Sequence, residues 1–431
     1  MHSVRRKKKW ALAAVLGLIL AVIACAPATA PTPTPTKTPA AATPTAAPKA
    51  EGSGQSPAKP TAKPLRIGVM NPLTGPLAVA GKLAQIGYDM AAEDINKAGG
   101  INGSPVELVT YDTKADPREA MTVFRKLALE DKVAAVMGPF SGSEFDVVAP
   151  LANELKVLSA SQAVKYGLAA QNRPWAFQIL LQSTEWWPQG VEAFKKKYPG
   201  IKKVTLGRDV KYASTEWEGK VLLPKLLADA GLELAGSVEW ETGTKDWAAI
   251  ATKIKDLGAE GLFVTGVYPD APGLFKELGR LGYKPKVAIS NMFMHVSVLW
   301  TVPEALEGAV VPYWVDWTRP DPKLQDFVAR WKTKAAADQA IPKPPAGGYD
   351  LFPTNEVAQY DSLMAIAEAA RKAGITGSSP LEEAREKIRD GYAALRDYPG
   401  LVGKISVLPT GDVKWPITVF TIEGAKPKAL D

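Results

Sequence analysis

Short apolar runs and amphipathic stripes alternate along most of this chain. Residues 65–70 form an apolar run, and a loop rich in Pro and Gly follows at 71–76. The next apolar positions are spaced by three, four and five residues: Leu83, Ile86, Met90 and Ile95. That spacing puts one apolar stripe on a helix. The helix is predicted to end at Gly99 and Gly100, because glycine adopts a left-handed C-terminal cap at least cost. Residues 65–100 therefore predict a strand, a loop and a helix.

The same alternation continues and then repeats. Further strands are predicted at 106–111, 133–137 and 157–158, with helices at 116–129 and 144–155. A second series predicts strands at 204–207, 238–240, 262–267 and 287–290, with helices at 217–230, 244–257 and 271–281. Pro224 is expected to kink the first of these helices. Alternating strands and helices indicate parallel sheets covered by helices on both faces. We therefore predict an α/β fold of two doubly wound lobes.

The end of the chain departs from this alternation. Helices are predicted at 355–373 and 380–392, and then two strands at 404–408 and 414–422 joined by a turn at 409–412. These elements must join lobes that are already built, so the chain is expected to cross between the lobes more than once. We assign 65–181 and 313–403 to the first lobe, 182–312 to the second, and 404–431 to a terminal hairpin associated with the second lobe. A cleft between two hinged lobes is the default ligand site.

The start of the chain carries targeting signals instead of a fold. Five basic residues at 5–9 precede an apolar run at 11–24. This run has the length of a signal-peptide core and is short for a bilayer span. It ends in Val22-Ile23-Ala24 before Cys25, the single cysteine of the chain, and this sequence resembles a bacterial lipobox. The resemblance implies a lipoprotein signal peptide at 1–24 and lipidation of Cys25. The alternative is an uncleaved N-terminal membrane helix.

Residues 25–64 differ in composition from everything after them. They are nearly all Ala, Pro, Thr, Ser, Gly and Lys, with Glu51 as the one acid. Such a segment cannot bury enough apolar surface to fold, and its prolines favour an extended spacer. We predict a disordered tether. Nine of the 52 Lys and Arg residues lie in 1–64, so the remainder carries 43 basic against 44 acidic residues. Its charge therefore indicates no nucleic-acid partner.

The residue types needed for common catalytic sites are scarce from residue 65 onward. His295 is the only histidine there, and there is no cysteine. This argues against a Cys/His zinc site and a Cys/His nucleophile pair, and no Gly-x-Ser-x-Gly elbow is present. Gly81-Lys82 is followed by Leu83 where a phosphate-binding loop has Ser or Thr. We predict that the protein is no enzyme and uses no metal and no cofactor.

Several motifs in order resemble the leucine/isoleucine/valine-binding proteins of ABC importers. They are Pro72-Leu73-Thr74-Gly75-Pro76, Gly87, 92–96 before 99–103, Tyr111-Asp112 with Asp116-Pro117, and Gly138-Pro139 before a serine-rich loop. The resemblance implies a two-lobed type I periplasmic-binding fold with three crossover strands that closes over a small solute. It further implies a monomeric receptor that delivers its solute to ABC permease subunits. A lipid anchor on Cys25 would hold it at the outer face of the cytoplasmic membrane, on the periplasmic or extracellular side.

The same resemblance implies a set of ligand-binding positions. Groups that would hold a ligand carboxylate fall at Ser141, Gly142 and Ser143 and at 162–165, including Gln162 and Ala163. Two aromatic positions of the second lobe fall at Tyr212 and Tyr268. The acid that would pair with a ligand ammonium falls near Asn291, with Phe293 beside it.

Asn291 is neutral, and a buried ammonium without a countercharge costs several kcal/mol. Amino acids, aromatic acids and urea-like amides therefore all stay open as ligands. Trp186 and Trp187 fall near the first crossover between the lobes. Two interpretations of them stay open, as aromatic cleft residues or as hinge and surface packing.

Two other functional classes stay open. One is a ligand-binding sensor module for a small carboxylate, aromatic acid or amide that transports nothing. Neighbouring permease and ATPase genes would argue for transport, and a neighbouring kinase or chemoreceptor for sensing. The other is a secreted enzyme on a similar scaffold, which turnover of a candidate ligand would reveal.

Overall fold

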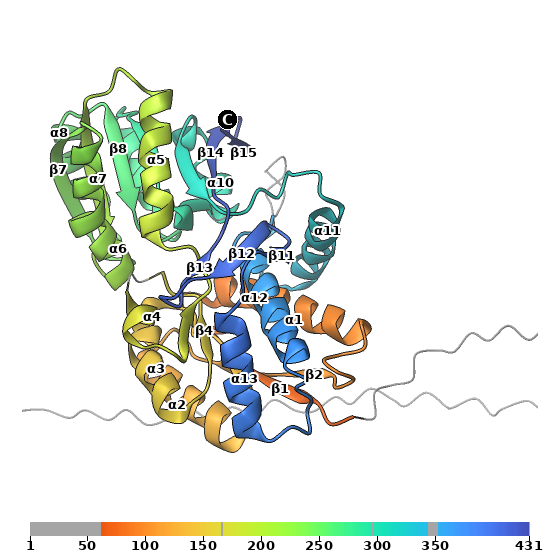
Figure 1. Ribbon diagram of the computed structural model, residues 1–431. Coiled ribbons are helices and arrows are strands. Elements are labelled where there is room, and N and C mark those ends of the chain that lie inside the picture. Colours follow the sequence, from red (N-terminus) through yellow and green to blue (C-terminus); the bar gives the residue numbers. More distant parts are fainter. Residues whose placement is uncertain (1–61, 165–166, 295, 344–351, 431) are drawn as a thin grey trace, which may run out of the picture. The chain divides into compact units, whose positions relative to one another are not determined.

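The computed structural model describes residues 62–164, 167–294, 296–343 and 352–430 (Figure 1). The predicted signal peptide, Cys25, residues 25–61 of the predicted tether, Lys165 and His295 lie outside the described residues. Within the described part of the chain, no helix combines the length and apolar character that a membrane crossing requires.

The first lobe is built on a five-stranded parallel sheet in the order β2-β1-β3-β4-β5. Its strands are β1 (Leu65–Asn71), β2 (Val106–Asp112), β3 (Ala135–Met137), β4 (Ser159–Ser161) and β5 (Ala176–Gln178). The helices between them are α1 (Ala78–Lys97), α2 (Pro117–Arg125), α3 (Gly142–Leu155) and α4 (Leu168–Gln171), with a π-helical turn, η1 (Lys126–Glu130).

The second lobe is built on a seven-stranded sheet in the order β15-β14-β10-β9-β8-β6-β7. Its parallel strands are β6 (Lys203–Asp209), β7 (Glu233–Trp240), β8 (Gly261–Thr265), β9 (Lys286–Ile289) and β10 (Val310–Tyr313). The last two, β14 (Thr418–Glu423) and β15 (Lys426–Ala429), are antiparallel. Its α-helices are α5 (Ser183–Lys197), α6 (Ala213–Trp217), α7 (Leu223–Asp229), α8 (Ala248–Asp256), α9 (Ala271–Arg280) and α10 (Val296–Thr301). Three short helical turns complete it: η2 (Glu218–Leu222), η3 (Asn291–Met294) and η4 (Glu304–Leu306). The predicted α/β class with two lobes is confirmed.

The chain passes between the two sheets three times, after β5, after β10 and before β14. Between the second and third passages it forms α11 (Pro322–Ala337), α12 (Glu356–Lys372) and α13 (Leu381–Ala393). A small antiparallel sheet follows, made of β11 (Tyr398–Gly400), β12 (Gly403–Val407) and β13 (Val413–Lys414). Figure 1 shows the blue α12 beside the orange α1, which it contacts along much of its length.

Several predicted elements differ in detail from the structure, and three of them are informative. The strand predicted at 157–158 lies two residues later, as β4. The predicted kinked helix at 217–230 is α6, a π-helical turn at Glu218–Leu222, and α7 with Pro224 in its first turn. The strand predicted at 414–422 is broken into β13 and β14 around Pro416, because proline has no N–H for the ladder.

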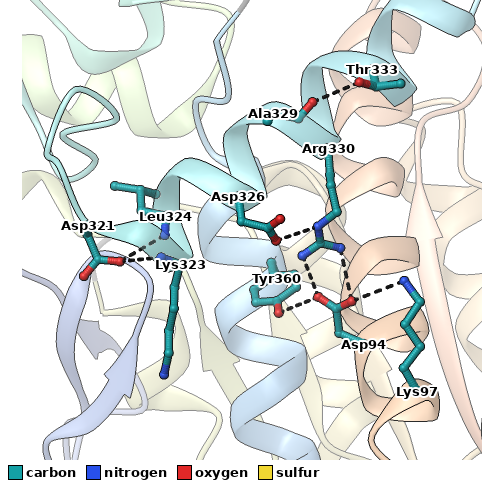
Figure 2. A network of polar contacts seen from close by, with 10 residues as sticks. All are labelled: Asp94, Lys97, Asp321, Lys323, Leu324, Asp326, Ala329, Arg330, Thr333 and Tyr360. Carbon is teal, nitrogen blue, oxygen red and sulfur yellow. Dashed lines mark hydrogen bonds and ion pairs between the residues drawn. The ribbon is translucent and has the colours of Figure 1, made fainter.

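A polar network fixes α11 against the first lobe (Figure 2). The Arg330 guanidinium donates two hydrogen bonds to the Asp94 carboxylate, at 3.1 and 2.8 Å, and Tyr360 of α12 donates a third at 2.9 Å. Asp326 accepts from Arg330 at 2.8 Å. Paired guanidinium–carboxylate bonds are strong and directional. The acids of the 92–96 motif therefore hold helices together; Glu93 likewise accepts from Lys334 at 2.7 Å.

Gly87 allows α12 to lie directly against α1. A Cβ atom at Gly87 would stand 2.6 Å from the Glu356 carbonyl oxygen, which is closer than real contacts permit. Glycine at this position therefore leaves room for the first turn of α12, which carries Glu356, to pack against α1.

Candidate functional site

One cavity is lined by loops that follow strands of both sheets. From the first lobe it is lined by the start of α1, by residues after β3 and β4, and by the start of α12. From the second lobe it is lined by residues after β6, β8 and β9 and by the end of β10. The space measures about 1040 Å³, part of it open to solvent. Ligands of α/β proteins bind at the carboxyl ends of parallel strands, so this is the candidate site.

Apolar side chains form a large part of the wall. They are Leu77, Ala80, Leu83, Ala84, Phe140, Val164, Leu180, Val267 and Met294. The first turn of α1 can approach the 72–76 loop because Gly81 has no Cβ, which would meet the Pro72 carbonyl oxygen at 2.1 Å. The loop itself is held by Asp112, which accepts from the Leu73 N–H at 2.8 Å and from the Thr74 hydroxyl at 2.5 Å. The loop therefore positions α1, and the start of α1 supplies part of the apolar wall.

A chain of buried amides runs behind the cavity. Gln359 donates to the Gln162 side-chain oxygen at 2.5 Å, and Gln162 donates to Asn71 and to the Tyr88 hydroxyl, both at 3.2 Å. The Gln359 amide nitrogen donates within this series of hydrogen bonds, so its side-chain oxygen is the acceptor left at the end of the series. That oxygen is buried and has no hydrogen-bond partner among the described residues, and the same is true of the Asn291 side-chain oxygen. Two unpaired acceptors thus belong to residues that line the cavity.

Two buried carboxyl groups also line the cavity. Glu356 lies at the start of α12, where Thr354 donates to it through its N–H and its hydroxyl. Glu218 lies in the π-helical turn and accepts from Thr265 at 2.5 Å and from the Trp187 indole at 3.2 Å. Burial raises the pKa of Glu218 and the pKa of Glu356, each to about 7. None of these donors is a cation.

Three tyrosines face the same space. Tyr313 donates to the Asn355 side chain at 3.1 Å, and burial raises its pKa, with the nearby Glu356 adding to the effect. Burial raises the pKa of Tyr268 to about 12 and also raises the pKa of Tyr212. All three phenols are therefore neutral near pH 7 and offer both hydroxyl groups and ring faces.

The start of α3 presents a different surface to the cavity. Ser141 caps this helix, and its N–H and hydroxyl both donate to the Glu144 carboxylate, at 2.8 and 2.6 Å. The Ala163 N–H donates to the Ser161 hydroxyl at 3.0 Å. The donors of Ser141 and Ala163 that were expected to meet a ligand carboxylate are thus engaged within the protein.

Comparison with known proteins identifies the family. A model of the periplasmic binding protein family matches residues 64–426. This chain belongs to that family. Its resemblance to the leucine/isoleucine/valine-binding proteins, which are solute-binding proteins of ABC transporters, is thereby confirmed. A Pseudomonas aeruginosa relative, named as a leucine-, isoleucine-, valine-, threonine- and alanine-binding protein, is 25% identical over 363 residues, 83% of this chain and 89% of that protein.

Solved structures of other periplasmic binding proteins share the fold. The branched-chain amino acid transporter substrate-binding protein LivJ of Streptococcus pneumoniae, in complex with isoleucine, has a TM-score of 0.72 at 22% identity and covers 85% of this chain and 99% of its own. A Rhodopseudomonas palustris solute-binding protein, in complex with p-hydroxybenzoic acid, has a TM-score of 0.72 at 19% identity and covers 85% and 96%. Periplasmic binding proteins of this fold thus accommodate ligands of different chemistry.

The structure brings seven of the nine predicted ligand-binding residues of this family member to the cavity. They are Ser141, Gly142, Gln162, Ala163, Tyr212, Tyr268 and Asn291. Ser143 is absent from the lining, and its hydroxyl lies 3.2 Å from that of Ser141. Phe293 is buried in the second lobe against the edge of Phe275. Contact of these nine residues with a ligand stays a prediction.

Trp186 and Trp187 are packing residues. Both are fully buried, their rings lie 4.6 Å apart, and neither lines the cavity. The Trp187 ring also packs near Phe263 of β8. Of the two interpretations open at the sequence level, the structure favours packing.

Sequence reasoning missed Glu218, Glu356, Gln359 and Tyr313. It found no countercharge at Asn291, whereas two carboxyl groups reach the cavity from other elements. The one available signal was a glutamate at the start of an unusually apolar helix, at 356. The position of Glu218 depends on the π-helical turn, and no pattern in the sequence predicted that turn.

Proposed function

We propose that this protein is the extracytoplasmic receptor of an ABC importer. It captures a small, amino-acid-like solute between its two lobes and delivers that solute to a membrane permease. Cys25 carries a lipid anchor that keeps the receptor near its permease, and residues 25–64 act as a tether. The solute binds as a single copy to a monomeric receptor.

The observation that carries this proposal is the composition of the cavity. Both lobes contribute to one space that combines apolar walls with buried polar groups. A solute that touches both lobes is bound most fully when they close, so binding shifts the population toward the closed form. Named relatives bind branched-chain amino acids, and similar folds hold hydroxybenzoates. These ligands share the small size and the mixed polar and apolar character that the cavity would accept.

A thermal-shift screen of the purified protein tests the proposal. The panel contains branched-chain and other amino acids, aromatic acids, amides and amines. A ligand present at 100 times its dissociation constant adds ~2.7 kcal/mol of stability, which moves the midpoint by a few degrees in a protein of this size. If no small solute moves the midpoint, the receptor function is contradicted.

A further inference from the structure

We propose that the solute is recognised through a positively charged group, an ammonium or amidinium on an apolar body, and that Glu356 is its countercharge. This inference rests on the proposed receptor function and narrows its substrate class. Three independent features of the cavity support it.

The first feature is a pair of buried carboxyl groups that no cation of the protein compensates. Glu218 and Glu356 line the cavity, and its described lining contains no Lys, Arg or His. The groups that face Glu356 are the Thr354 N–H and hydroxyl and the phenol of Tyr313, all of them neutral. A buried carboxylate is costly unless a cation pairs with it. The protein places the carboxyl groups at the cavity and leaves the pairing cation to be supplied by the solute.

The second feature is the pair of unpaired acceptors. The side-chain oxygens of Asn291 and Gln359 are buried without a donor among the described residues, and both residues line the cavity. A buried acceptor left without a hydrogen bond costs about 1–3 kcal/mol. An ammonium group has three N–H donors and no acceptor, so a solute that carries one supplies the kind of donor that these oxygens and a carboxylate lack.

The third feature is aromatic. Tyr212, Tyr268 and Tyr313 line the cavity together with Phe140. The face of an aromatic ring attracts a desolvated cation within ~6 Å of its centre. Because the three phenols stay neutral near pH 7, they add no charge of their own.

Two of the residues expected to hold a ligand carboxylate have their donors engaged within the protein. Those of Ser141 are taken by Glu144, and the Ala163 N–H is taken by Ser161. An amino acid meets the cavity's requirement through its ammonium group. A simple organic acid brings only a negative charge, which Glu218 and Glu356 repel wherever they are ionised.

Ligands built on one carbon skeleton test this inference. Isothermal titration calorimetry of the purified protein compares isoleucine, 2-methylbutylamine and 3-methylvaleric acid, and in parallel 4-hydroxybenzylamine and 4-hydroxybenzoate. We expect the amine of each set to bind at least tenfold more tightly than the acid of that set. Tighter binding of the acids than of the amines would overturn the inference and leave the receptor function standing. Failure of every compound in the panel to bind would instead contradict the receptor function.

Two variants test the assignment of Glu356. Glu356→Gln keeps the shape of the side chain and removes its charge, and it should weaken amine binding at least tenfold. The matched control is Asp361→Asn on the same helix, a buried carboxyl that accepts from the Leu401 N–H and is absent from the cavity lining. It should leave amine affinity unchanged. Equal affinities of Glu356→Gln and the unaltered protein for the amines would rule out Glu356 as the countercharge. The ligand comparison on the unaltered protein decides the charge preference even if a variant fails to fold.

Discussion

At the scale of single residues, three buried carboxyl groups have strongly raised pKa values. Glu218 and Glu356 line the cavity, and Asp361 lies deeper, near Arg319 and the turn between β11 and β12. Burial raises the pKa of each of the three to about 7. Between about pH 4.5 and 7, such groups are mostly protonated in the folded, ligand-free protein and mostly ionised in the unfolded chain.

This difference predicts a pH dependence of stability. A raised folded-state pKa contributes stability that is fully present below the unfolded pKa, near 4, and is lost as the pH rises through about 7. The ligand-free protein should therefore lose free energy of unfolding between about pH 4.5 and 7.5, on the order of 3 kcal/mol per group. Urea unfolding across this range measures the slope. Glu356→Gln should flatten the slope by its own share, and an unchanged slope would show that Glu356 titrates normally.

Tyr268 is expected to act on ligand binding more than on folding. It is half-buried at the cavity, so Tyr268→Ala removes a ring face and a hydroxyl from the binding surface. We expect the variant to abolish the ligand-induced thermal shift while the ligand-free midpoint stays nearly constant. Tyr283→Ala is the matched control, since Tyr283 is also half-buried in the second lobe but outside this cavity. An equally large loss of ligand-free stability would make Tyr268 a core residue.

Sequence reasoning could place Tyr212, Tyr268 and Asn291 at the cavity through the resemblance to the leucine/isoleucine/valine-binding proteins. It could not locate Glu356 or Gln359 in the same way. Their place in the cavity depends on α12 lying against α1, a contact between segments more than 250 residues apart in the chain. Sequence reasoning could not decide the roles of Trp186 and Trp187 either. Their burial depends on residues distant in the chain, such as Phe263 of β8, that pack beside them.

At the scale of elements, the contact between α1 and α12 connects the fold to the site. Gly87 in α1 leaves room for the carbonyl oxygen of Glu356, the first residue of α12. The Asp94–Arg330–Tyr360 network then ties α1, α11 and α12 together farther along. Helix placement, and not loop chemistry alone, thus determines where Glu356 stands.

Gly87→Ala tests this connection. The new methyl group would overlap the Glu356 carbonyl, so α12 must shift, at a cost of about 1–3 kcal/mol in free energy of unfolding. Because the shift moves Glu356, affinity for the ligand should fall as well. Both are measured by urea unfolding and calorimetry.

Gly279→Ala in α9 provides the control, because a Cβ there meets nothing within 4 Å. It should be neutral or raise stability by up to ~1 kcal/mol, since alanine favours helix more than glycine does. If Gly87→Ala behaved like Gly279→Ala, the close approach of the two helices would be refuted.

At the scale of the whole molecule, we expect membrane attachment through Cys25 and ligand binding in the cavity to be independent of each other. Cys25→Ala should shift the protein from the membrane fraction to the soluble fraction, because a lipid on Cys25 is the proposed attachment. Ligand affinity should not change, since the residues that line the cavity begin at Leu77. Fractionation with mass measurement of the mature N-terminus checks the first point, and isothermal titration calorimetry checks the second. Retention of Cys25→Ala in the membrane would favour the uncleaved-helix alternative.

The central claim is that a small solute binds in the cavity lined by both lobes. Isothermal titration calorimetry of the best compound from the screen tests it directly, on the unaltered protein and on Tyr212→Ala, Tyr268→Ala and Glu356→Gln. We predict one solute per chain and at least tenfold weaker binding in variants of either lobe. Absence of binding by every solute, or full affinity in all three variants, would contradict the account.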